Sequence, residues 1–374
     1  MAKVFFARQA DYEQSGIDSA VRRVFAHFGG IDRFVGKGER VLLKVNLVAG
    51  HEVSRRVSTD PAIVRAVAKL VLEAGAVPFI ADSPGIDSFS RAAEKAGFLQ
   101  VAQELGIECR ELTDPADLPA SDSADFKHIQ VSRQVLEADK VISLAKLKTH
   151  GQMYLTMGVK NLFGCVPGRL KAGWHYNVGL NREKFASLLL DIYAGVSPCF
   201  TLIDGVIGMH GDGPTSGDPY SFGLIGGSVD ALTMDLWLCR MLGAKLEDYP
   251  LYLAAKRKGL PQCEMNPSDV EGDFAVTHVF DGVKLPKTRS MRLLPRLPFL
   301  ERLMTSRPVH IPELCIGCGR CAAVCAAHAL RHENKHLYFD YSKCIRCYCC
   351  HEMCPVKAIE FRESRLLKLI NRLR

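Results

Sequence analysis

The chain has 374 residues, of which 48% are hydrophobic and 24% charged, values that are ordinary for a globular protein and suit one large domain with a smaller module. No apolar run approaches the roughly 18 residues of a membrane span, and the N-terminal stretch MAKVFFARQADYEQSG lacks the apolar core of a signal peptide, so we expect a cytoplasmic protein. The formal net charge is +7, but no nucleic-acid recognition motif accompanies it, and we predict no nucleic-acid partner.

Apolar strand-like runs alternate with helix-like runs from the N-terminus onward, which is typical of an α/β domain with a largely parallel sheet flanked by helices. Asp60 and Pro61 form an N-cap and first-turn pair that opens a helix ending at Gly75. Asp230 is the expected cap of a later helix. The predicted strands are residues 3–8, 40–48, 77–85, 139–147, 199–209 and 223–227, and the predicted helices are residues 17–28, 61–75, 88–105, 182–195 and 230–243.

Polar side chains interrupt or follow several of these apolar strands. In an open parallel sheet, ligands bind outside the carboxyl ends of the strands. A lysine in a buried strand is costly unless it is paired, faces a polar cavity or reaches solvent at an edge. Several such lysines at adjacent strand ends favour an anionic ligand. The candidate substrate-binding residues of this group are Lys44, Asn46, Asp60, Asp82, Lys146, Lys148 and Asp204.

The stretch from 146 to 175 is rich in lysine, histidine and glycine and has no extended helical or alternating pattern. Such a cationic segment after a strand suits a loop that encloses an anionic substrate or a metal. His150, Lys160 and His175 are the candidate catalytic residues, and Asn161 and Lys171 are candidate substrate-binding residues. The alternative is that each histidine is an ordinary polar loop residue.

Two cysteine runs of the form C-x2-C-x2-C-x3-C dominate the C-terminal part. Residues 308–362 resemble the bacterial ferredoxin domain, which implies two [4Fe-4S] clusters, each ligated by three cysteines of one run and the last cysteine of the other. The implied ligands are Cys315, Cys318, Cys321 and Cys354 for one cluster, and Cys344, Cys347, Cys350 and Cys325 for the other. Ala326 replaces an expected proline, and Cys349 leaves the register of one ligand open. Zinc sites need two C-x2-C pairs set well apart, and disulfides need an oxidising compartment.

The chain also resembles the DUF362 family over residues 2–280. The resemblance rests on the stretches LLKVNLV, VSTDPAIVRAV, ADSPG, LAKLKTHGQMYLTMGVKNLFGCVPG and DGVIGMHGDGP, in that order. Members of this family often carry a C-terminal ferredoxin module, so the resemblance implies an iron–sulfur redox protein without naming a reaction. The layout of Gly158, Lys160, Pro167 and Gly168 between His150 and His175 is similar to that of nickel-pincer lactate racemases, with a longer spacing from lysine to proline. This similarity implies a further metal or organic cofactor in the α/β domain.

The predicted organisation is an α/β domain over residues 1–283, a basic linker over 284–307, a ferredoxin-like α+β domain over 308–362 and a basic amphipathic tail over 363–374. We expect an oxidoreductase that passes single electrons between the clusters and an anionic substrate or cofactor in the α/β cleft, with a low-potential electron donor or acceptor protein as partner. The alternative is a non-catalytic electron carrier or assembly factor that docks to a larger redox complex. The basic stretches fit a solvated linker and helix face, or docking to an acidic partner or an anionic membrane surface.

Overall fold

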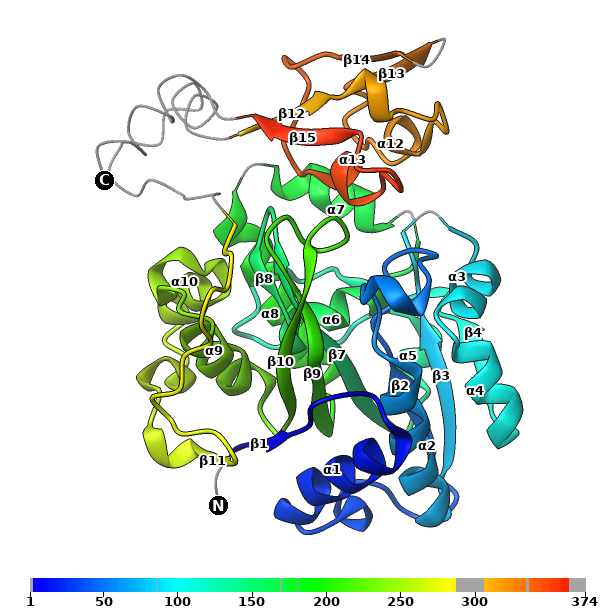
Figure 1. Ribbon diagram of the computed structural model, residues 1–374, viewed down its shortest axis with the longest axis vertical. Helices are drawn as coiled ribbons and strands as arrows, with labels where there is room; N and C mark the ends of the chain where they lie inside the picture. Colours follow the sequence, from blue (N-terminus) through cyan, green and yellow to red (C-terminus); the bar gives the residue numbers. More distant parts are fainter. Residues whose placement is uncertain are drawn as a thin grey trace.

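The computed structural model describes residues 3–85, 87–168, 170–179, 181–286, 306–333 and 336–362. Within these residues, the α/β domain contains a nine-stranded mixed sheet with helices on both faces (Figure 1). The strand order is β11-β1-β10-β9-β7-β2-β3-β4, and β8 pairs with the end of β7. Neighbouring strands from β9 to β4 run parallel, whereas β10 is antiparallel to both β1 and β9. The predicted α/β class with a largely parallel sheet is confirmed.

The elements of the α/β domain lie close to the predicted positions. The sheet strands are β1 (Val4–Arg8), β2 (Arg40–Lys44), β3 (Val77–Asp82), β4 (Glu108–Glu111), β7 (Lys140–His150), β8 (Tyr154–Thr156), β9 (Phe200–His210), β10 (Asp218–Ser228) and β11 (Val270–Gly272). A separate hairpin pairs β5 (Pro115–Asp117) with β6 (Gln130–Ser132). The helices are α1 (Gln14–His27), α2 (Pro61–Glu73), α3 (Phe89–Lys95), α4 (Phe98–Leu105), α5 (Arg133–Leu136), α6 (Gly158–Asn161), α7 (Leu170–Val178), α8 (Arg182–Val196), α9 (Ala231–Met241) and α10 (Pro250–Arg257).

Two hydrophobic cores lie on the two faces of the sheet because successive side chains of a strand point to opposite sides. On β2, Val41 and Leu43 pack with α1, α2, α3 and α4, whereas Leu42 packs into the core that contains α8, α9 and α10. On β3, Ile80 packs on the same face as Val41 and Leu43, and Phe79 packs on the same face as Leu42. The near-continuous apolar character of these strands therefore reflects burial on both faces.

Local signals explain where several helices begin and end. Asp60 caps α2 as predicted, since its side chain accepts a hydrogen bond from the Ala62 N–H at 3.0 Å. The predicted helix over residues 88–105 is divided into α3 and α4 at Gly97, which has a φ of +76°. The segment predicted to be irregular contains helix α7, and β7 extends to His150, beyond its predicted end.

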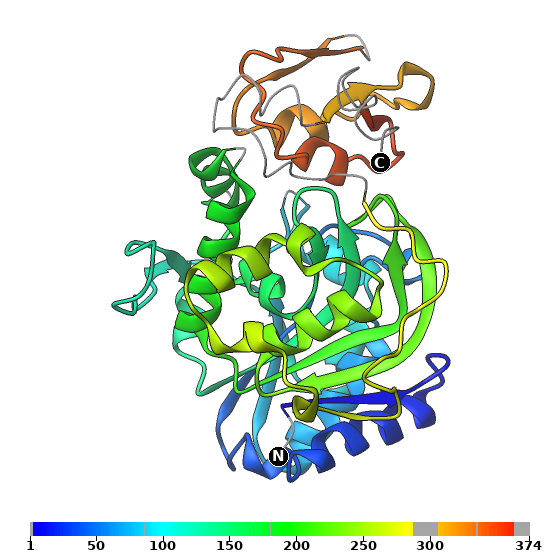
Figure 2. The same cartoon turned by 90° about the vertical axis from the view of Figure 1, so that its left-hand side faces the viewer.

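The cysteine-rich domain lies over the edge of the sheet at which β2, β3 and β7 end, and Figures 1 and 2 both place it there. It pairs β12 (Arg307–His310) with β15 (Ile359–Arg362) and β13 (Leu330–Glu333) with β14 (His336–Phe339), and it contains α12 (Arg320–Ala323) and α13 (Cys349–Glu352). Thr215 Oγ1 donates a hydrogen bond to the Glu352 carbonyl at 2.7 Å, and Arg320 forms an ion pair with Asp87. These contacts join the two domains.

The predicted basic linker and tail fall mostly outside the described residues, since 287–305 and 363–374 are not described. The predicted domain limits therefore stay predictions. Among the described helices, none combines the length and the apolar character needed to cross a bilayer.

Candidate functional site

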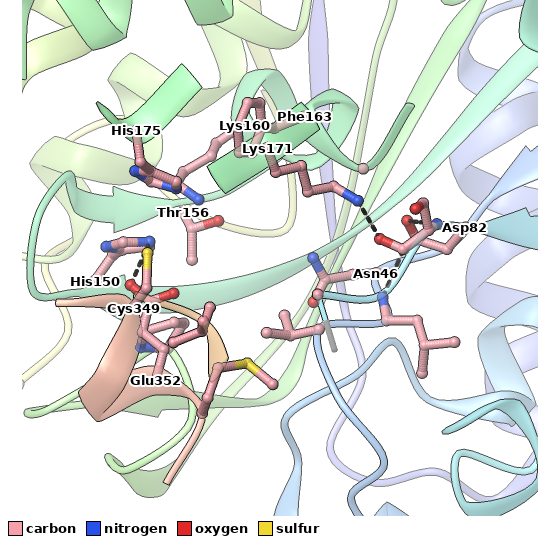
Figure 3. A pocket seen from close by; sticks show the side chains of 18 of the residues that line it. Asn46, Asp82, His150, Thr156, Lys160, Phe163, Lys171, His175, Cys349 and Glu352 are labelled. Atoms are coloured by element: carbon pink, nitrogen blue, oxygen red, sulfur yellow. Dashed lines mark hydrogen bonds and ion pairs between the residues drawn. The ribbon is translucent and has the colours of Figure 1, made fainter. Parts of the chain in front are cut away.

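A cavity of about 340 Å³ lies between the two domains, at the carboxyl ends of β2, β3 and β7 (Figure 3). Most of the residues predicted from the sequence to form a binding site line it. They are Asn46, Asp82, Lys148, His150, Lys160, Asn161, Lys171 and His175. This volume is within the usual range for small-molecule sites, which is about 300–1,000 Å³. The structure therefore brings the three candidate catalytic residues into one pocket, here called the interdomain pocket.

The short helix α6 carries Lys160 and Asn161 into this pocket, and a buried acid on α9 holds the helix in place. The carboxylate of Asp235 accepts hydrogen bonds from the backbone N–H groups of Gly158 at 2.8 Å and Val159 at 3.0 Å. Burial raises the pKa of Asp235 to about 7, although these two N–H groups oppose the shift. Sequence reasoning missed Asp235, because it lies within a helix whose spacing reads as an ordinary core face.

An ion pair lies at one side of the pocket. Lys44, at the end of β2, contacts Asp82, at the end of β3, with 2.9 Å between Nζ and Oδ1, and neither side chain is more than 4% exposed. Asp82 also accepts hydrogen bonds from the backbone N–H groups of Leu47 and Ser83, both at 2.7 Å. A Cβ on Gly164 would lie only 2.2 Å from Asp82 Oδ1, so the backbone approaches the pair where only glycine fits.

Three further lysines contribute positive charge to the pocket. Lys148 donates to Asn46 Oδ1 and to the Val57 carbonyl, both at 2.7 Å, and Lys171 donates to the Ser83 carbonyl at 2.5 Å. Burial lowers the pKa of Lys148 to about 7 and that of Lys171 to about 8. Lys160 has no hydrogen-bond acceptor among the described residues; its ammonium lies 5.8 Å from the centre of the Phe163 ring.

The two histidines are neutral and have different surroundings. His150 Nδ1 accepts hydrogen bonds from the backbone N–H groups of Gln152 at 3.1 Å and Met153 at 3.3 Å, which assigns the ring proton to Nε2. Burial holds the pKa of His150 well below its usual value. His175 packs against the rings of Phe163 and Phe185, its Nδ1 has no partner among the described residues, and burial lowers its pKa to about 3.

The cysteine-rich domain supplies the other wall of the pocket. Glu352 Oε1 lies 3.4 Å from His150 Nε2 without accepting a hydrogen bond within the described part of the chain. Cys349 and Met353 line the same wall. The sequence alone gave no indication of Glu352, because its contact with the pocket arises only when two domains far apart in the chain come together.

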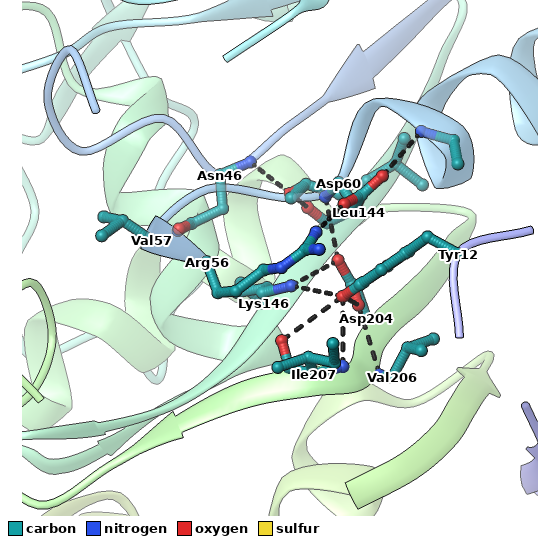
Figure 4. Close-up of polar contacts among 12 residues, drawn as sticks. Tyr12, Asn46, Arg56, Val57, Asp60, Leu144, Lys146, Asp204, Val206 and Ile207 are labelled. Atoms are coloured by element: carbon teal, nitrogen blue, oxygen red, sulfur yellow. Dashed lines mark hydrogen bonds and ion pairs between the residues drawn. The ribbon is translucent and has the colours of Figure 1, made fainter. Parts of the chain in front are cut away.

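Three of the predicted site residues lie elsewhere, in a buried polar network around Asp204 in the middle of β9 (Figure 4). Lys146 Nζ contacts Asp204 Oδ2 at 2.7 Å, and both side chains are fully buried. Tyr12 donates to Asp204 Oδ1 at 2.7 Å, and the Asp60 N–H donates to Asp204 Oδ2 at 2.9 Å. Arg56 pairs with Asp60 at 2.5 Å. This network fastens the start of α2 to the sheet, and its ligand-binding role stays a prediction.

The cysteines gather in the two sets implied by the ferredoxin resemblance. One small cavity is lined by the first set, Cys315, Cys318, Cys321 and Cys354. In the second set, burial and then the nearby thiols, Cys347 first, raise the pKa of Cys350. Among the described residues, no three His, Cys, Asp or Glu side chains are arranged to hold a single metal ion. Four thiols around a cavity fit a cubane. A single zinc ion would instead hold four sulfurs at Zn–S distances of about 2.3 Å.

Cys349 does not share the surroundings of Cys350. The Cys350 side chain packs with Cys321 and Leu330 inside the cysteine-rich domain, whereas Cys349 faces the interdomain pocket. The Cys349 thiol also shares a hydrogen bond with Cys347, so the choice of Cys350 rather than Cys349 as the ligand stays a prediction.

Known proteins resemble both domains. The family described as "Domain of unknown function (DUF362)" matches residues 41–240, and the 4Fe-4S dicluster domain matches residues 314–363. A thylakoid-associated protein of Synechocystis is 38% identical over 288 residues, which cover 76% of this chain and 88% of that protein. A pyruvate synthase subunit of Methanocaldococcus jannaschii is 38% identical over 63 residues, which cover 16% of this chain and 73% of that subunit.

Two further similarities are more limited. Formate hydrogenlyase subunit 2 of Escherichia coli is 32% identical over 85 residues, which cover 22% of this chain and 40% of that subunit. The solved structure of lactate racemase apoprotein from Thermoanaerobacterium thermosaccharolyticum has a TM-score of 0.37 at 10% identity and covers 63% of this chain and 56% of that one. The extent of the family match and of the Synechocystis similarity is decisive: the chain belongs to the DUF362 family and carries a C-terminal iron–sulfur domain of the electron-transfer type.

Proposed function

We propose that this protein is an iron–sulfur oxidoreductase whose substrate is an anionic small molecule bound in the interdomain pocket. The observation that carries the proposal is the composition of the pocket wall. Cationic side chains from the α/β domain face residues that directly adjoin predicted cluster ligands, since Val324 precedes Cys325 and Cys349 precedes Cys350.

The residues that would hold two [4Fe-4S] clusters are the two sets of four cysteines described above. Burial and the neighbouring thiols raise the pKa of Cys350, so its thiolate form would need a metal to stabilise it, as a cluster does. When bound, the clusters supply or accept single electrons. The further metal or organic cofactor inferred from the racemase similarity has no support beyond that similarity.

The residues of the pocket would bind and orient the substrate. Lys160, which has no hydrogen-bond acceptor in the part of the chain that the structure describes, would bind an anionic group of the substrate. The Nε2–H of His150 points toward the wall that holds Glu352, so it is placed to donate a hydrogen bond to the bound molecule. The cysteine-rich domain covers one side of the pocket, and keeping water from that side would strengthen these interactions.

The test uses protein purified anaerobically, with an expected content of about eight irons per chain for two cubanes. The clusters are reduced, excess reductant is removed, and fractions of a cell's small molecules are added while the visible absorbance of the clusters is followed. We expect one anionic fraction to reoxidise the wild-type clusters. Lys160→Met should abolish this reaction with the absorbance of the oxidised clusters intact, whereas the exposed control Lys184→Met should retain it.

The same experiment separates the enzyme from the alternative of an electron carrier or assembly factor. The curated relatives of the cluster segment are subunits of formate hydrogenlyase and pyruvate synthase, so a redox protein is the expected electron partner. If only proteins, and no small molecules, reoxidise the clusters, and Lys160→Met has no effect, the carrier function replaces the enzyme.

A further inference from the structure

The charges that face the interdomain pocket fall into two groups at its two sides. On one side Lys171 and Asp82 line the pocket, with Lys44 paired to Asp82 behind the lining, and on the other side Lys148 and Lys160 lie with Glu352. Figure 3 shows Lys171 reaching toward Asp82, with Lys160 on the side of His150 and Glu352. Each group therefore has two cations and one anion, and each has one formal positive charge in excess.

Among the carboxylates, the one in its own group acts most strongly on each pocket lysine. Asp82 is the strongest opposing charge on Lys171, with Glu111 the weaker acid, and Glu352 is the carboxylate acting most strongly on Lys160. The acceptors within reach of Lys44 and Lys171 include the Val45 and Ser83 carbonyls, which supply no charge. Within the described residues, no carboxylate forms an ion pair with Lys148, Lys160 or Lys171.

Apart from these charges and the polar residues Asn46, Thr156 and Asn161, much of the pocket lining is apolar. The apolar side chains come from both domains and are Leu47, Val48, Phe163, Ala172, Pro214, Ala323, Val324 and Met353. An uncharged surface of this kind favours an apolar ligand body, because transfer of apolar area out of water is favourable.

We propose that the ligand of the interdomain pocket carries an anionic group at each end of an apolar body, as a linear dicarboxylate does. One anionic group would lie at Lys160 with the Nε2–H of His150, and the other at Lys171, beside the Lys44–Asp82 pair. This inference rests on the proposed function, which requires only one anionic group, and it adds the second.

A ligand with two anionic ends would also offset the effect of burial on the pKa values of the pocket lysines. Burial lowers the pKa of Lys148, Lys160 and Lys171, which means that the empty pocket disfavours their charged forms. Bound carboxylates would restore those charges, so binding should be accompanied by proton uptake near neutral pH.

Titration calorimetry on the anaerobically prepared protein with its clusters oxidised tests the proposal. The probes are succinate, glutarate and adipate, each matched with the monocarboxylate of the same carbon number. A charge-assisted hydrogen bond to the second anionic group should make the best dicarboxylate bind about 10- to 100-fold more tightly than its monocarboxylate. Lys171→Met should reduce this ratio to near one, Lys171→Arg should preserve most of it, and the exposed control Lys184→Met should leave it unchanged.

Equal affinity for the two series would overturn the two-ended ligand and leave the redox proposal intact, because that proposal needs one anionic group only. A ratio that survives both Lys160→Met and Lys171→Met would also overturn it. The remaining explanation is that the excess positive charge of the lysines sets the midpoint potential of the clusters. A change of cluster midpoint potential in Lys160→Met, together with an unchanged affinity ratio, would establish that explanation instead. Tryptophan fluorescence and cluster absorbance confirm that each variant is folded.

Discussion

Replacing Lys146 by methionine should destabilise the α/β domain strongly, although Lys146 lies outside the interdomain pocket. Its ammonium is fully buried, 2.7 Å from Asp204 Oδ2 and 2.8 Å from the Tyr12 hydroxyl. Methionine preserves most of the volume but leaves the Asp204 carboxylate buried without a cation. Removing one partner of a buried pair costs about 3–5 kcal/mol, because the remaining charge is uncompensated.

The contacts of Asp204 place the expected loss within that range. The carboxylate would keep three neutral donors, the Tyr12 hydroxyl and the N–H groups of Asp60 and Val206, so Lys146→Met should cost about 3 kcal/mol of unfolding free energy. Asp204→Asn leaves a buried ammonium with only neutral acceptors, the Tyr12 hydroxyl and the new amide oxygen, and should cost about 4 kcal/mol. The double variant buries no charge at this position, so its loss should be smaller than the sum by about 2 kcal/mol.

Urea unfolding followed by tryptophan fluorescence measures this cycle. Trp174 and Trp237 are the two tryptophans of the chain, and both lie in the α/β domain, so the signal reports on that domain separately from the cysteine-rich one. Strictly additive losses in the double variant would refute the reasoning, because they would mean that Lys146 and Asp204 do not compensate each other's charge.

Three further predictions concern the pocket and the clusters. Gly164→Ala should cost about 3 kcal/mol or more and weaken anion binding, because its Cβ would displace the buried ion pair beside it, whereas Gly173→Ala in α7 should be neutral or slightly stabilising. Cys350→Ser should lower the iron content of the purified protein, and Cys349→Ser should not. Anion affinity measured by calorimetry should fall as the pH rises through about 7, where Lys148 loses its proton.

Each of these predictions has an outcome that contradicts it. Equal stability of the Gly164→Ala and Gly173→Ala variants would show that the backbone has room beside the ion pair. Iron loss from Cys349→Ser would shift the ligand register by one residue. An affinity that stays constant from pH 6 to pH 9 would mean that Lys148 does not contribute its charge to the ligand.

Much of the fold could be predicted because its signals are local. The cap formed by Asp60 and the alternation of apolar runs act within a few residues, and both lead to elements that the structure contains. The short edge strands β4 and β11 could not be found in the same way. Half or more of their residues are exposed or partly exposed, so their apolar pattern is weak, and their pairing partners are distant in sequence.

Most residues of the candidate site could be predicted from the sequence, but not which of them line the interdomain pocket and which belong to the network around Asp204. Lys146 and Lys148 follow one another at alternate positions of β7, and the sequence suggested one common role for them. In the structure, Lys146 pairs with Asp204 on β9, whereas Lys148 reaches Asn46 after β2, because the register of β7 with β9 shifts between the two lysines. Such a division depends on which strands become neighbours, and so does the contribution of Glu352 from the other domain.

Helix α13 is a single short segment with two faces, and its two consecutive cysteines have different surroundings. Cys349 faces the interdomain pocket, where we place the ligand, and Cys350 packs inside the cysteine-rich domain. The segment that would hold the second cluster is therefore also part of the wall of the interdomain pocket, so the iron content of the protein and its affinity for the ligand are expected to be linked.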